Sequence, residues 1–534
     1  MPLIFSPFGG VVPKADPLAL PEGAAQVAEN CRVSSGTLEA FRNPLQVYAP
    51  TTPGLKTIYR LGQTTNSDTN YWLTFTKNVD VVKGAVAADV EERTYYTGDG
   101  YPKVTTAAMA LTSRPYPATY YRLGLPAPAA LPIATVHGAA SSETAIAETR
   151  FYIYTFVSSM DEESAPSAPS NEVTFRDGQA VTLMLGNVPS GAYNVTRKRI
   201  YRTVTGSSST AYLLVAEVPA SSGAFEDTAL AANLGEVCPS IEYLQLPDAA
   251  RGLTAMPNGM MAAHTDYDVY FCVPHKPYAY PLSYMQTVDY PVVGLGSFGT
   301  SLLVLTTGTP YLMSGTDPSS ISVEKLAVPY ACLSKKSIVC AMGGVLFAAS
   351  DGLVVVDHSG PKVLSDELFT RREWSALNPA SMVCAVWDER IFVFYDNGVA
   401  RGGYIFAGDG LTTTSVYATA AFTDPVTGSL FLCVDDKIVK WDAGLAGEFT
   451  WESRREQVPV PKNFAYGQVL AAAYPITVSI YADGALAHQQ IVVDDKPFRL
   501  PSGFRARYWG LKLKGFARTF AAVIADTVGE LQSV

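Results

Sequence analysis

The chain is poor in charged residues and lacks the cysteine patterns of metal or redox sites. Charged side chains make up 16% of its 534 residues, against about 25% in an average soluble domain. The seven cysteines are scattered without a C-x-x-C pair, and their odd number argues against a disulfide framework. Several alternate with apolar residues, so we expect small buried side chains in a reducing compartment.

Long apolar segments are also missing. No run of about 18 apolar residues occurs, which predicts no stable membrane insertion. The opening residues, MPLIFSPFGGVVPKADP, have no basic segment followed by an apolar core, so no secretory signal is expected there. The net charge of −10 disfavours a high-affinity nucleic-acid binder, yet it suits an acidic wall along which DNA slides without sticking.

Motifs for catalysis or cofactor binding are absent or weak. GLGSFG at 294–299 has the glycine spacing of a dinucleotide site, but a strand-like segment follows it, which favours a glycine-rich turn between strands. No G-x-S-x-G motif occurs, and no Cys–His pairing is suggested. The five histidines share no metal-ligand spacing and are His137, His264, His275, His358 and His488. We predict no catalytic, cofactor-binding or metal-binding residues and no enzyme activity.

Two kinds of acidic turn leave an enzyme as an alternative. Ser350-Asp351-Gly352 is similar to the Asp-containing turns of some propeller hydrolases, although Asp-Gly is also the commonest hairpin signal. Asp435-Asp436 and Asp494-Asp495 are expected at solvated turns. A glycosidase would need two carboxylates facing each other across a cleft.

The densest basic stretch is TRKRIYR at 196–202. On a strand, one face would carry Arg197, Arg199 and Tyr201, and the other Lys198, Ile200 and Arg202. Contact with phosphate is one interpretation. The favoured one is a partner-facing sheet surface with ion pairs to the acidic loop MDEES at 160–164.

Short paired β-type runs dominate the second half of the chain. Their step is roughly 40–45 residues, the period of a four-stranded propeller blade. The apolar centres of these runs are Phe271, Val304, Phe347, Phe392 and Phe431. We predict an all-β chain: a β-propeller with an inserted fibronectin- or immunoglobulin-like β-sandwich and a C-terminal β domain.

This pattern divides the chain into five parts. They are an N-terminal segment with the first blade (1–113), a Pro/Ala-rich linker (114–139), the sandwich (140–245), the remaining blades (246–450) and the C-terminal β domain (451–534). The first blade would use strands at 55–61, 70–84 and 93–105, the last turning at Gly98-Asp99-Gly100. Helices are expected at 21–30 and 367–378, and a hairpin at 31–41 turning at Ser35-Gly36.

Several segments together resemble one family. They are ALPEGAAQVAENCRVSSGTLEAFRNP (19–44), RTYYTGDGYPKVT (93–105), RFYIYTFVSSMDEESAPSAPSNEV (150–173), KRIYRTVTGSSSTAYLLVAEVP (198–219), GLTAMPNGMMAAH (252–264), VPHKPYAYPLSY (273–284) and PFRLPSGFRARYW (497–509). The family is that of the nozzle, or tail-tube, proteins of short-tailed bacteriophages. The blocks run over nearly the whole chain and contain no active site to transfer.

The resemblance implies a virion structural protein of the phage tail, assembled in the host cytoplasm. It implies a homohexameric ring that docks below the head-to-tail adaptor, carries fibres or spikes nearby and surrounds passing double-stranded DNA. Such a ring would retain the genome and release it on infection. One alternative is a receptor-binding or fibre-anchoring propeller. The other is a polysaccharide-degrading propeller enzyme of the virion.

Overall fold

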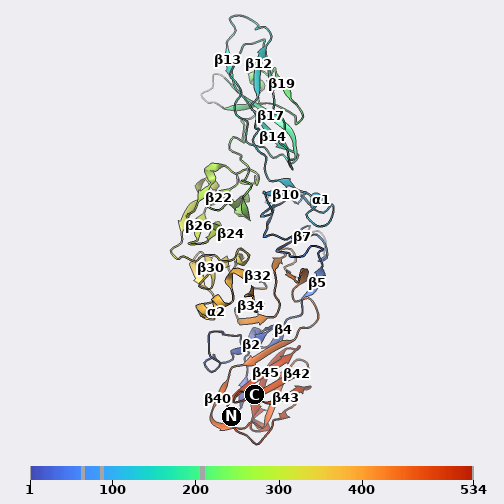
Figure 1. The fold of residues 1–534 in the computed structure, drawn as a ribbon, viewed down its shortest axis with the longest axis vertical. Coiled ribbons are helices and arrows are strands. Elements are labelled where there is room, and N and C mark those ends of the chain that lie inside the picture. The colour runs from blue at the N-terminus through green and yellow to red at the C-terminus, as the bar shows by residue number, and fades with distance from the viewer. Residues whose placement is uncertain (1, 62–66, 85–88, 205–210, 532–534) are drawn as a thin grey trace. The chain divides into compact units, whose positions relative to one another are not determined.

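The computed structural model describes residues 2–61, 67–84, 89–204 and 211–531 of an all-β chain (Figure 1). Within these residues the α-helices are short, and none could cross a membrane. They are α1 (Ala107–Ala110), α2 (Arg371–Ala376) and α3 (Val528–Leu531). The chain divides into two compact units. Unit 1 comprises residues 1–78, 305–310 and 325–534, and unit 2 comprises residues 79–304 and 311–324.

Unit 1 contains a series of small antiparallel sheets whose first strands touch one another in succession. Strand β32 contacts β28 and β36, and β36 contacts β6. The first of these sheets is β28 (Val339–Ala341), β29 (Gly344–Ala348), β30 (Leu353–Asp357) and β31 (Gly360–Val363). The next is β32 (Val383–Trp387), β33 (Arg390–Asp396), β34 (Arg401–Ala407) and β35 (Gly410–Thr414). The third joins β36 (Ala420–Thr423), β37 (Leu430–Val434) and β38 (Lys437–Lys440) to β5 (Leu45–Tyr48), and β6 (Thr57–Arg60) pairs with β7 (Trp72–Phe75).

Polar contacts tie these neighbouring sheets together. Thr423 Oγ1 donates to the Val386 carbonyl at 2.8 Å, and Ser334 Oγ donates to the Met382 carbonyl at 2.7 Å. Arg60, on β6, forms a buried ion pair of 3.0 Å with Asp424, next to β36. Because a buried guanidinium needs a carboxylate partner, this pair fixes the β6–β7 sheet against its neighbour.

Strand β5 joins the start of the chain to the last sheet of the series. It is the outer partner of β38, with Leu45 opposite Lys440. At the β37–β38 turn, Asp435 and Asp436 both have positive φ, as a two-residue type I′ hairpin requires. Asp436 Oδ1 accepts the Gly54 N–H at 2.8 Å, so this carboxylate is structural as well as part of a turn.

Unit 2 repeats the arrangement with three four-stranded sheets. Strand β20 contacts both β8 and β24, the first strands of the other two. Gly252 N donates to Asp80 Oδ2 at 2.9 Å, and Ser297 Oγ donates to the Ala255 carbonyl at 2.8 Å. The first sheet consists of β8 (Asp80–Lys83), β9 (Thr94–Thr97), β10 (Lys103–Thr105) and β11 (Tyr121–Arg122). The second consists of β20 (Arg251–Ala255), β21 (Met261–His264), β22 (Asp268–Phe271) and β23 (Gln286–Thr287). The third consists of β24 (Val292–Phe298), β25 (Ser301–Thr306), β26 (Tyr311–Ser314) and β27 (Ser322–Lys325).

The evenly spaced apolar centres all lie in the cores of these sheets. Val304, Phe347, Phe392 and Phe431 occupy the second strand of four sheets, while Phe271 lies on a third strand. Each of the five side chains is fully buried. The spacing in the sequence is therefore the spacing of successive sheets.

Between β11 and β20, unit 2 contains an inserted region of three small sheets. Its core includes Tyr152, Phe156, Val181 and Ile200. The sheets are β12 (Ile133–His137) with β16 (Ala180–Met184) and β19 (Ala224–Asp227), β13 (Glu148–Arg150) with β15 (Val173–Phe175), and β14 (Tyr152–Ser158) with β17 (Val195–Thr203) and β18 (Tyr212–Pro219).

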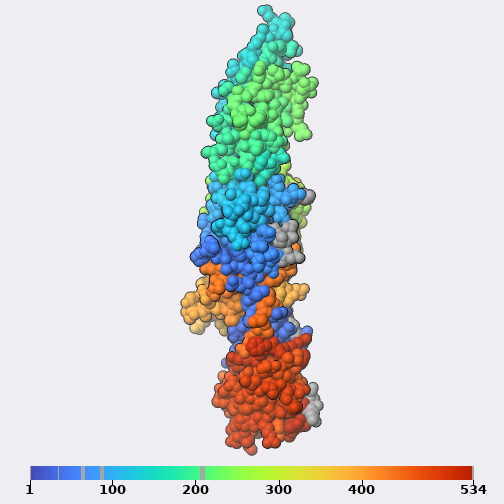
Figure 2. Space-filling model, turned by 90° about the vertical axis from the view of Figure 1, so that its right-hand side faces the viewer, coloured from blue at the N-terminus to red at the C-terminus, as the bar shows by residue number. Residues whose placement is uncertain are grey.

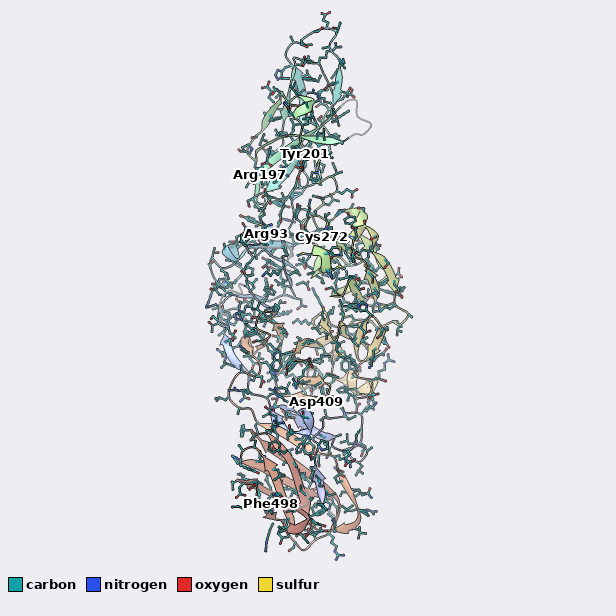
Figure 3. All side chains as sticks on the ribbon, turned by 180° about the vertical axis from the view of Figure 1, so that it is seen from behind. Arg93, Arg197, Tyr201, Cys272, Asp409 and Phe498 are labelled. Atoms are coloured by element: carbon teal, nitrogen blue, oxygen red, sulfur yellow. The ribbon has the colours of Figure 1, made fainter. Side chains whose placement is uncertain are left out.

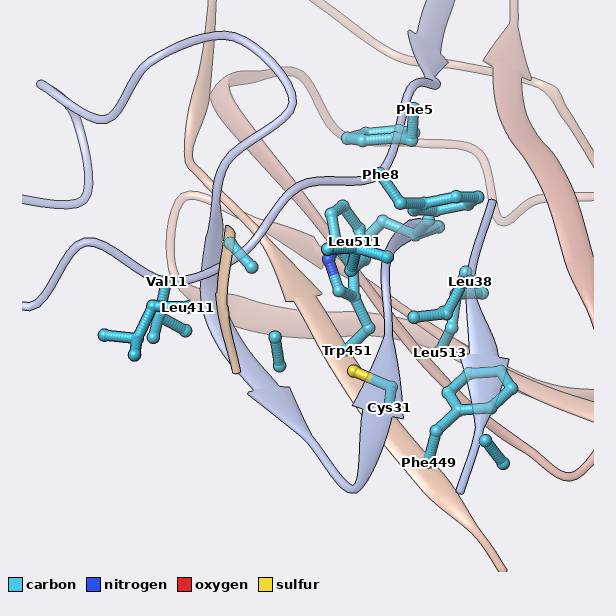
Figure 4. Packing of buried hydrophobic residues seen from close by; sticks show 14 of the residues in the cluster. Phe5, Phe8, Val11, Cys31, Leu38, Leu411, Phe449, Trp451, Leu511 and Leu513 are labelled. Atoms are coloured by element: carbon cyan, nitrogen blue, oxygen red, sulfur yellow. The ribbon is translucent and has the colours of Figure 1, made fainter. Parts of the chain in front are cut away.

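The C-terminal strands form a body that also includes the N-terminal strands β1 and β2. The C-terminal residues are red in Figure 2. In its core, Phe8 packs edge-on against Trp451, with ring centroids 4.9 Å apart (Figure 4). The longer sheet continues from β35 through β2 (Ala25–Glu29), β39 (Phe449–Ser453), β45 (Ala506–Gly515) and β42 (Ile476–Ala482) to β43 (Ala485–Val492), with β40 (Glu456–Lys462) on β45. The other is β1 (Leu3–Phe5), β46 (Thr519–Ala525), β41 (Tyr466–Ala471) and β44 (Phe498–Arg499).

Two local predictions are wrong. The segment 21–30 contains strand β2 (Ala25–Glu29) instead of a helix, because pairing with β39 buries Ala25 and Ala28 and outweighs local helix propensity. The strands at 55–105 do not make one sheet: β6 and β7 pair with each other, while β8 joins β9–β11. The break falls after β7 ends at Phe75.

Other local predictions are confirmed. The hairpin at 31–41 pairs β3 (Cys31–Arg32) with β4 (Glu39–Ala40), and its turn has positive φ at Ser35 and Gly36. Helix α2 lies inside 367–378, and Thr370 with Glu373 caps it. The segment 114–139 is not purely a linker, since it contains β11 and β12, which pair with β10 and β16.

Candidate functional site

The outer face of β17 carries a network of charged residues on the inserted region. Arg199 reaches Glu163 at 2.8 Å and Glu217 at 2.8 Å. Arg197 pairs with Glu217 at 2.9 Å and also with Asp161. Figure 3 shows Arg197 and Tyr201 together on this region. The predicted ion pairs between TRKRIYR and the acidic loop 160–164 are thus confirmed.

Glu163 is the centre of this network. Its side chain is buried, and it accepts hydrogen bonds from Tyr201 Oη at 2.6 Å and Thr155 Oγ1 at 2.8 Å in addition to Arg199. Burial, with Glu163 alongside, raises the pKa of Tyr201, so its hydroxyl stays a donor. Because these cations are already paired with carboxylates of the same chain, they are less available for contact with phosphate.

The other face of β17 is buried and polar, which the alternation alone did not reveal. Lys198 Nζ donates to the carbonyls of Gly186 at 2.8 Å and Ser222 at 2.7 Å, and burial lowers its pKa. Arg202 pairs with Asp227, which also accepts from Tyr152 Oη at 2.8 Å. The signal for this pairing in the sequence is only a lone Asp, 25 residues beyond the arginine.

Glu162 lies where the inserted region meets the sheets of unit 2. Its side chain is 2% exposed, and within the described residues Oε1 has no hydrogen-bond partner. Burial raises the pKa of Glu162 to about 7, with Arg93 opposing the shift. The charge of Glu162 also acts on Tyr95 of β9 and on Tyr278. No feature of MDEES distinguishes Glu162 from its neighbours in the sequence.

The two glutamates of this loop therefore differ in how they are compensated. Glu163 has an ion pair and two hydrogen bonds, whereas Glu162 has an arginine nearby but no hydrogen bond to Oε1. The first stabilises the surface network as a carboxylate. Burial of Glu162 raises its pKa, so it keeps its proton to a higher pH than an exposed glutamate does.

A prediction follows for the surface network. Replacing Arg199 by Ala leaves Glu163 buried without a cation, so we expect the free energy of unfolding to fall by about 1–3 kcal/mol. Arg197→Ala is the matched control. Its partner Asp161 is 77% exposed, so we expect this variant to lose less than about 1 kcal/mol of unfolding free energy. Chemical denaturation of both variants, with hydrogen exchange on β17, measures the difference. Equal losses would contradict the role given to Glu163.

Unit 1 contains a groove of about 860 Å³. Its lining includes Asp351, Asp366 and Glu367 together with Tyr330 and Phe406. Asp351 belongs to the predicted Ser350-Asp351-Gly352 hairpin turn and pairs with the exposed Arg371 at 2.5 Å. Carboxylates and aromatic rings thus line one concave surface, an arrangement that a polysaccharide-cleaving site would also need.

The remaining candidate residues are dispersed. Residues 294–298 of GLGSFG lie inside β24, and Gly299 falls in the turn to β25. The predicted glycine-rich turn is therefore mainly strand, because pairing within the sheet outweighs the glycine content. His264 is buried on β21, where Nδ1 donates to the Thr265 carbonyl at 2.6 Å. Among the described residues, no group of three His, Cys, Asp or Glu could hold a metal ion. All seven cysteines are free, and only Cys340 is exposed.

Comparisons with known proteins give no family. No family model and no curated protein matches the chain. One similar structure is BBS1N in complex with ARL6DN (9% identity, 49% of this chain and 86% of that chain, TM-score 0.26). Another is the N-terminal domain of Nup159 (9%, 62% and 86%, TM-score 0.22). A third is the extracellular domain of a B. thetaiotaomicron protein described as a hybrid two component system (8%, 88% and 47%, TM-score 0.31), of which this chain spans about half. At these TM-scores the similarities carry no functional argument.

Proposed function

We propose that this chain is the nozzle protein of a short phage tail, forming a ring around the channel through which DNA leaves. The observation that carries the proposal is the series of small sheets whose first strands touch one another in succession in each unit. In a β-propeller the first strands surround the axis, so we infer that these sheets are blades. The resemblance of the seven sequence blocks to phage nozzle proteins supplies the function.

The pairing of β5 with β38 supports a closed ring of blades. A propeller whose first and last sheets are separate can open at that seam. Here residues 45–48 complete the sheet of β36–β38, so one sheet contains both an early and a late strand. The buried Arg60–Asp424 pair lies next to the same sheet and supports closure further.

The inserted region would act as a sandwich-like module for docking. It is inserted between β11 and β20, that is, between two sheets, so its length and sequence can vary without interrupting a blade. Its paired surface around Arg199 and Glu163 suits contact with a neighbouring subunit, the adaptor or a fibre. The mechanism proposed is mechanical: the blades and the C-terminal body form a rigid wall, and loops that project into the channel retain the genome until infection.

Charge supports passage of DNA without adhesion. The net charge of −10 would give a six-membered ring roughly −60, and an acidic wall repels phosphate. The protein would be assembled in the host cytoplasm and then belong to the virion tail.

Electron microscopy of the purified protein tests this proposal. We expect particles with six-fold symmetry and an axial opening, either alone or after addition of the adaptor ring. Trimers that bind cells would favour the receptor-binding or fibre-anchoring alternative instead. A ring without a central opening would contradict the conduit.

The groove of unit 1 favours a second candidate, a polysaccharide-degrading enzyme of the virion. If the groove is catalytic, the protein should release oligosaccharides from host surface polysaccharide, and Glu367→Gln should abolish the release. Glu448→Gln, at an exposed residue outside the groove, is the control. Under the nozzle proposal, we expect no oligosaccharide release from the wild type or from either variant, because that proposal assigns no chemistry to these carboxylates.

A further inference from the structure

The turn between β45 and β46 exposes an alternating row of cations and aromatic rings. Its sequence, KGFARTF at 514–520, places Lys514, Phe516, Arg518 and Phe520 on the surface. The side chains of Phe516 and Phe520 are 53% and 42% exposed. We call these four residues the KFRF row.

The residues between them hold the turn against the protein. Gly515 and Thr519 are buried, and Ala517 packs on the edge of the main core. A Cβ on Gly515 would lie 2.4 Å from Cδ1 of Ile476, so the backbone is in close contact there. Thr519 exchanges backbone hydrogen bonds with Leu38 at 2.8 and 2.9 Å. The exposed rings are therefore presented by a fixed backbone.

The cations of the KFRF row have no carboxylate partner in the described part of the chain. Arg518 Nε donates to Thr37 Oγ1 at 3.1 Å, and its guanidinium lies 5.7 Å from the ring centre of Phe520. Lys514 forms no ion pair, although Glu448 adjoins Phe449, the residue opposite Gly515. The segment 496–518 has seven basic residues and no acidic one, although Lys496 pairs with Asp494 and Lys512 with Glu452.

Two exposed rings beside cations that lack a carboxylate partner indicate a binding partner that is both apolar and anionic. The half-exposed Phe side chains leave apolar surface in water that contact with a partner would remove. Proteins that bind single-stranded nucleic acid stack successive bases on rings along a basic groove, whereas Phe516 lies in the β45–β46 turn and Phe520 at the start of β46. A lipid interface accepts aromatic rings at the acyl boundary and cations at the phosphates.

We propose that the KFRF row docks the C-terminal body onto an anionic lipid surface. Phe516 and Phe520 enter the headgroup region, and Lys514 and Arg518 contact lipid phosphates. The binding is peripheral and leaves the fold unchanged. Lipid binding goes beyond the proposed function and needs only a single copy of the chain. A negative result for lipid binding and a negative result for ring formation can therefore be told apart.

Flotation of the purified full chain with vesicles tests this site. Wild-type protein should bind vesicles of equal parts phosphatidylglycerol and phosphatidylcholine, and bind pure phosphatidylcholine far less. Lys514→Gln with Arg518→Gln should weaken binding about thirtyfold and remove most of its salt dependence. Phe516→Ser with Phe520→Ser should weaken it about tenfold or more at any salt concentration.

A matched control lies on the β33–β34 turn of the same unit. Val399 is 96% exposed, and Arg401, which lies 3.7 Å from Asp435, is 61% exposed. Val399→Ser with Arg401→Gln therefore removes one apolar side chain and one cation from the surface elsewhere and should leave vesicle binding unchanged. In a Phe516→Trp variant, vesicles should shift the emission of the new indole to the blue, which reports insertion directly. Absence of wild-type binding, equal loss in the control, or binding to single-stranded DNA in place of vesicles would overturn the proposal.

Discussion

Replacing Asp227 by Ala is expected to lower the free energy of unfolding of the inserted region by about 3–5 kcal/mol. Asp227 is fully buried, and its carboxylate neutralises Arg202 and lies 3.8 Å from Arg150. It also accepts hydrogen bonds from Tyr152 Oη and the Ala229 N–H. Removing it leaves two nearly buried guanidinium groups without this counterion, and a buried unpaired charge is among the costliest single defects.

Hydrogen exchange is the measurement that isolates this effect. Amides of β14, β17 and β19 should lose protection in Asp227→Ala, while those of the C-terminal body should not. Asp161→Ala removes a carboxylate from an exposed pair on the same region and serves as the control, with an expected loss below about 1 kcal/mol. A second variant, Asp227→Leu with Arg202→Met, should recover most of the stability because it removes both charges. Equal protection in wild type and Asp227→Ala would contradict the role of this carboxylate.

Glu162 should make unit 2 less stable as pH rises toward neutrality. The pKa of Glu162 is raised to about 7 in the folded protein, above the value of 4.5 for an unperturbed glutamate. Between these values the folded state holds a proton that the unfolded state has released. The stabilisation is thus fully present below pH 4.5 and is lost as pH rises through 7. The shift corresponds to about 3 kcal/mol.

Glu162→Gln is the direct test, because an amide keeps the shape of the neutral acid and cannot ionise. We expect the wild type to lose about 2.5 kcal/mol more than this variant between pH 5 and pH 8, because part of the stabilisation is already lost below pH 5. The charged and titratable groups acting on Glu162 are Arg93, Tyr95 and Tyr278, and none of these tyrosines ionises in that range, because burial raises the pKa of both. Glu172→Gln, at an exposed site, should follow the wild-type curve. Superimposable curves for Glu162→Gln and wild type would show that Glu162 is ionised in the folded protein.

Features set by local pattern could be predicted from the sequence. Apolar centres such as Phe347 and Phe392 revealed the succession of sheets, since each four-stranded unit needs a similar length of chain. Alternation along TRKRIYR placed Arg199 on the face that meets Glu163, because successive strand residues point to opposite sides. Glycine and acidic pairs marked tight turns, as at Asp435-Asp436.

Features set by distant pairing could not be predicted. The pairing of β5 with β38 and of β2 with β39 joins opposite ends of the chain, and no local signal specifies such partners. Without such a signal, the local pattern at 21–30 predicts a helix. For the same reason, the sequence does not predict the boundary between two sheets after Phe75. Burial of Glu162 and Asp227 depends on the same long-range packing, so their roles are visible only in three dimensions.

A cryo-electron microscopy map of the tail of the phage particle that contains this chain tests the central claim most directly. The proposal predicts six copies around the tail axis below the adaptor ring, each with its sheets arranged as blades beside an open DNA channel. A map with this chain in three copies at fibre tips, or in a position away from the channel, would contradict it.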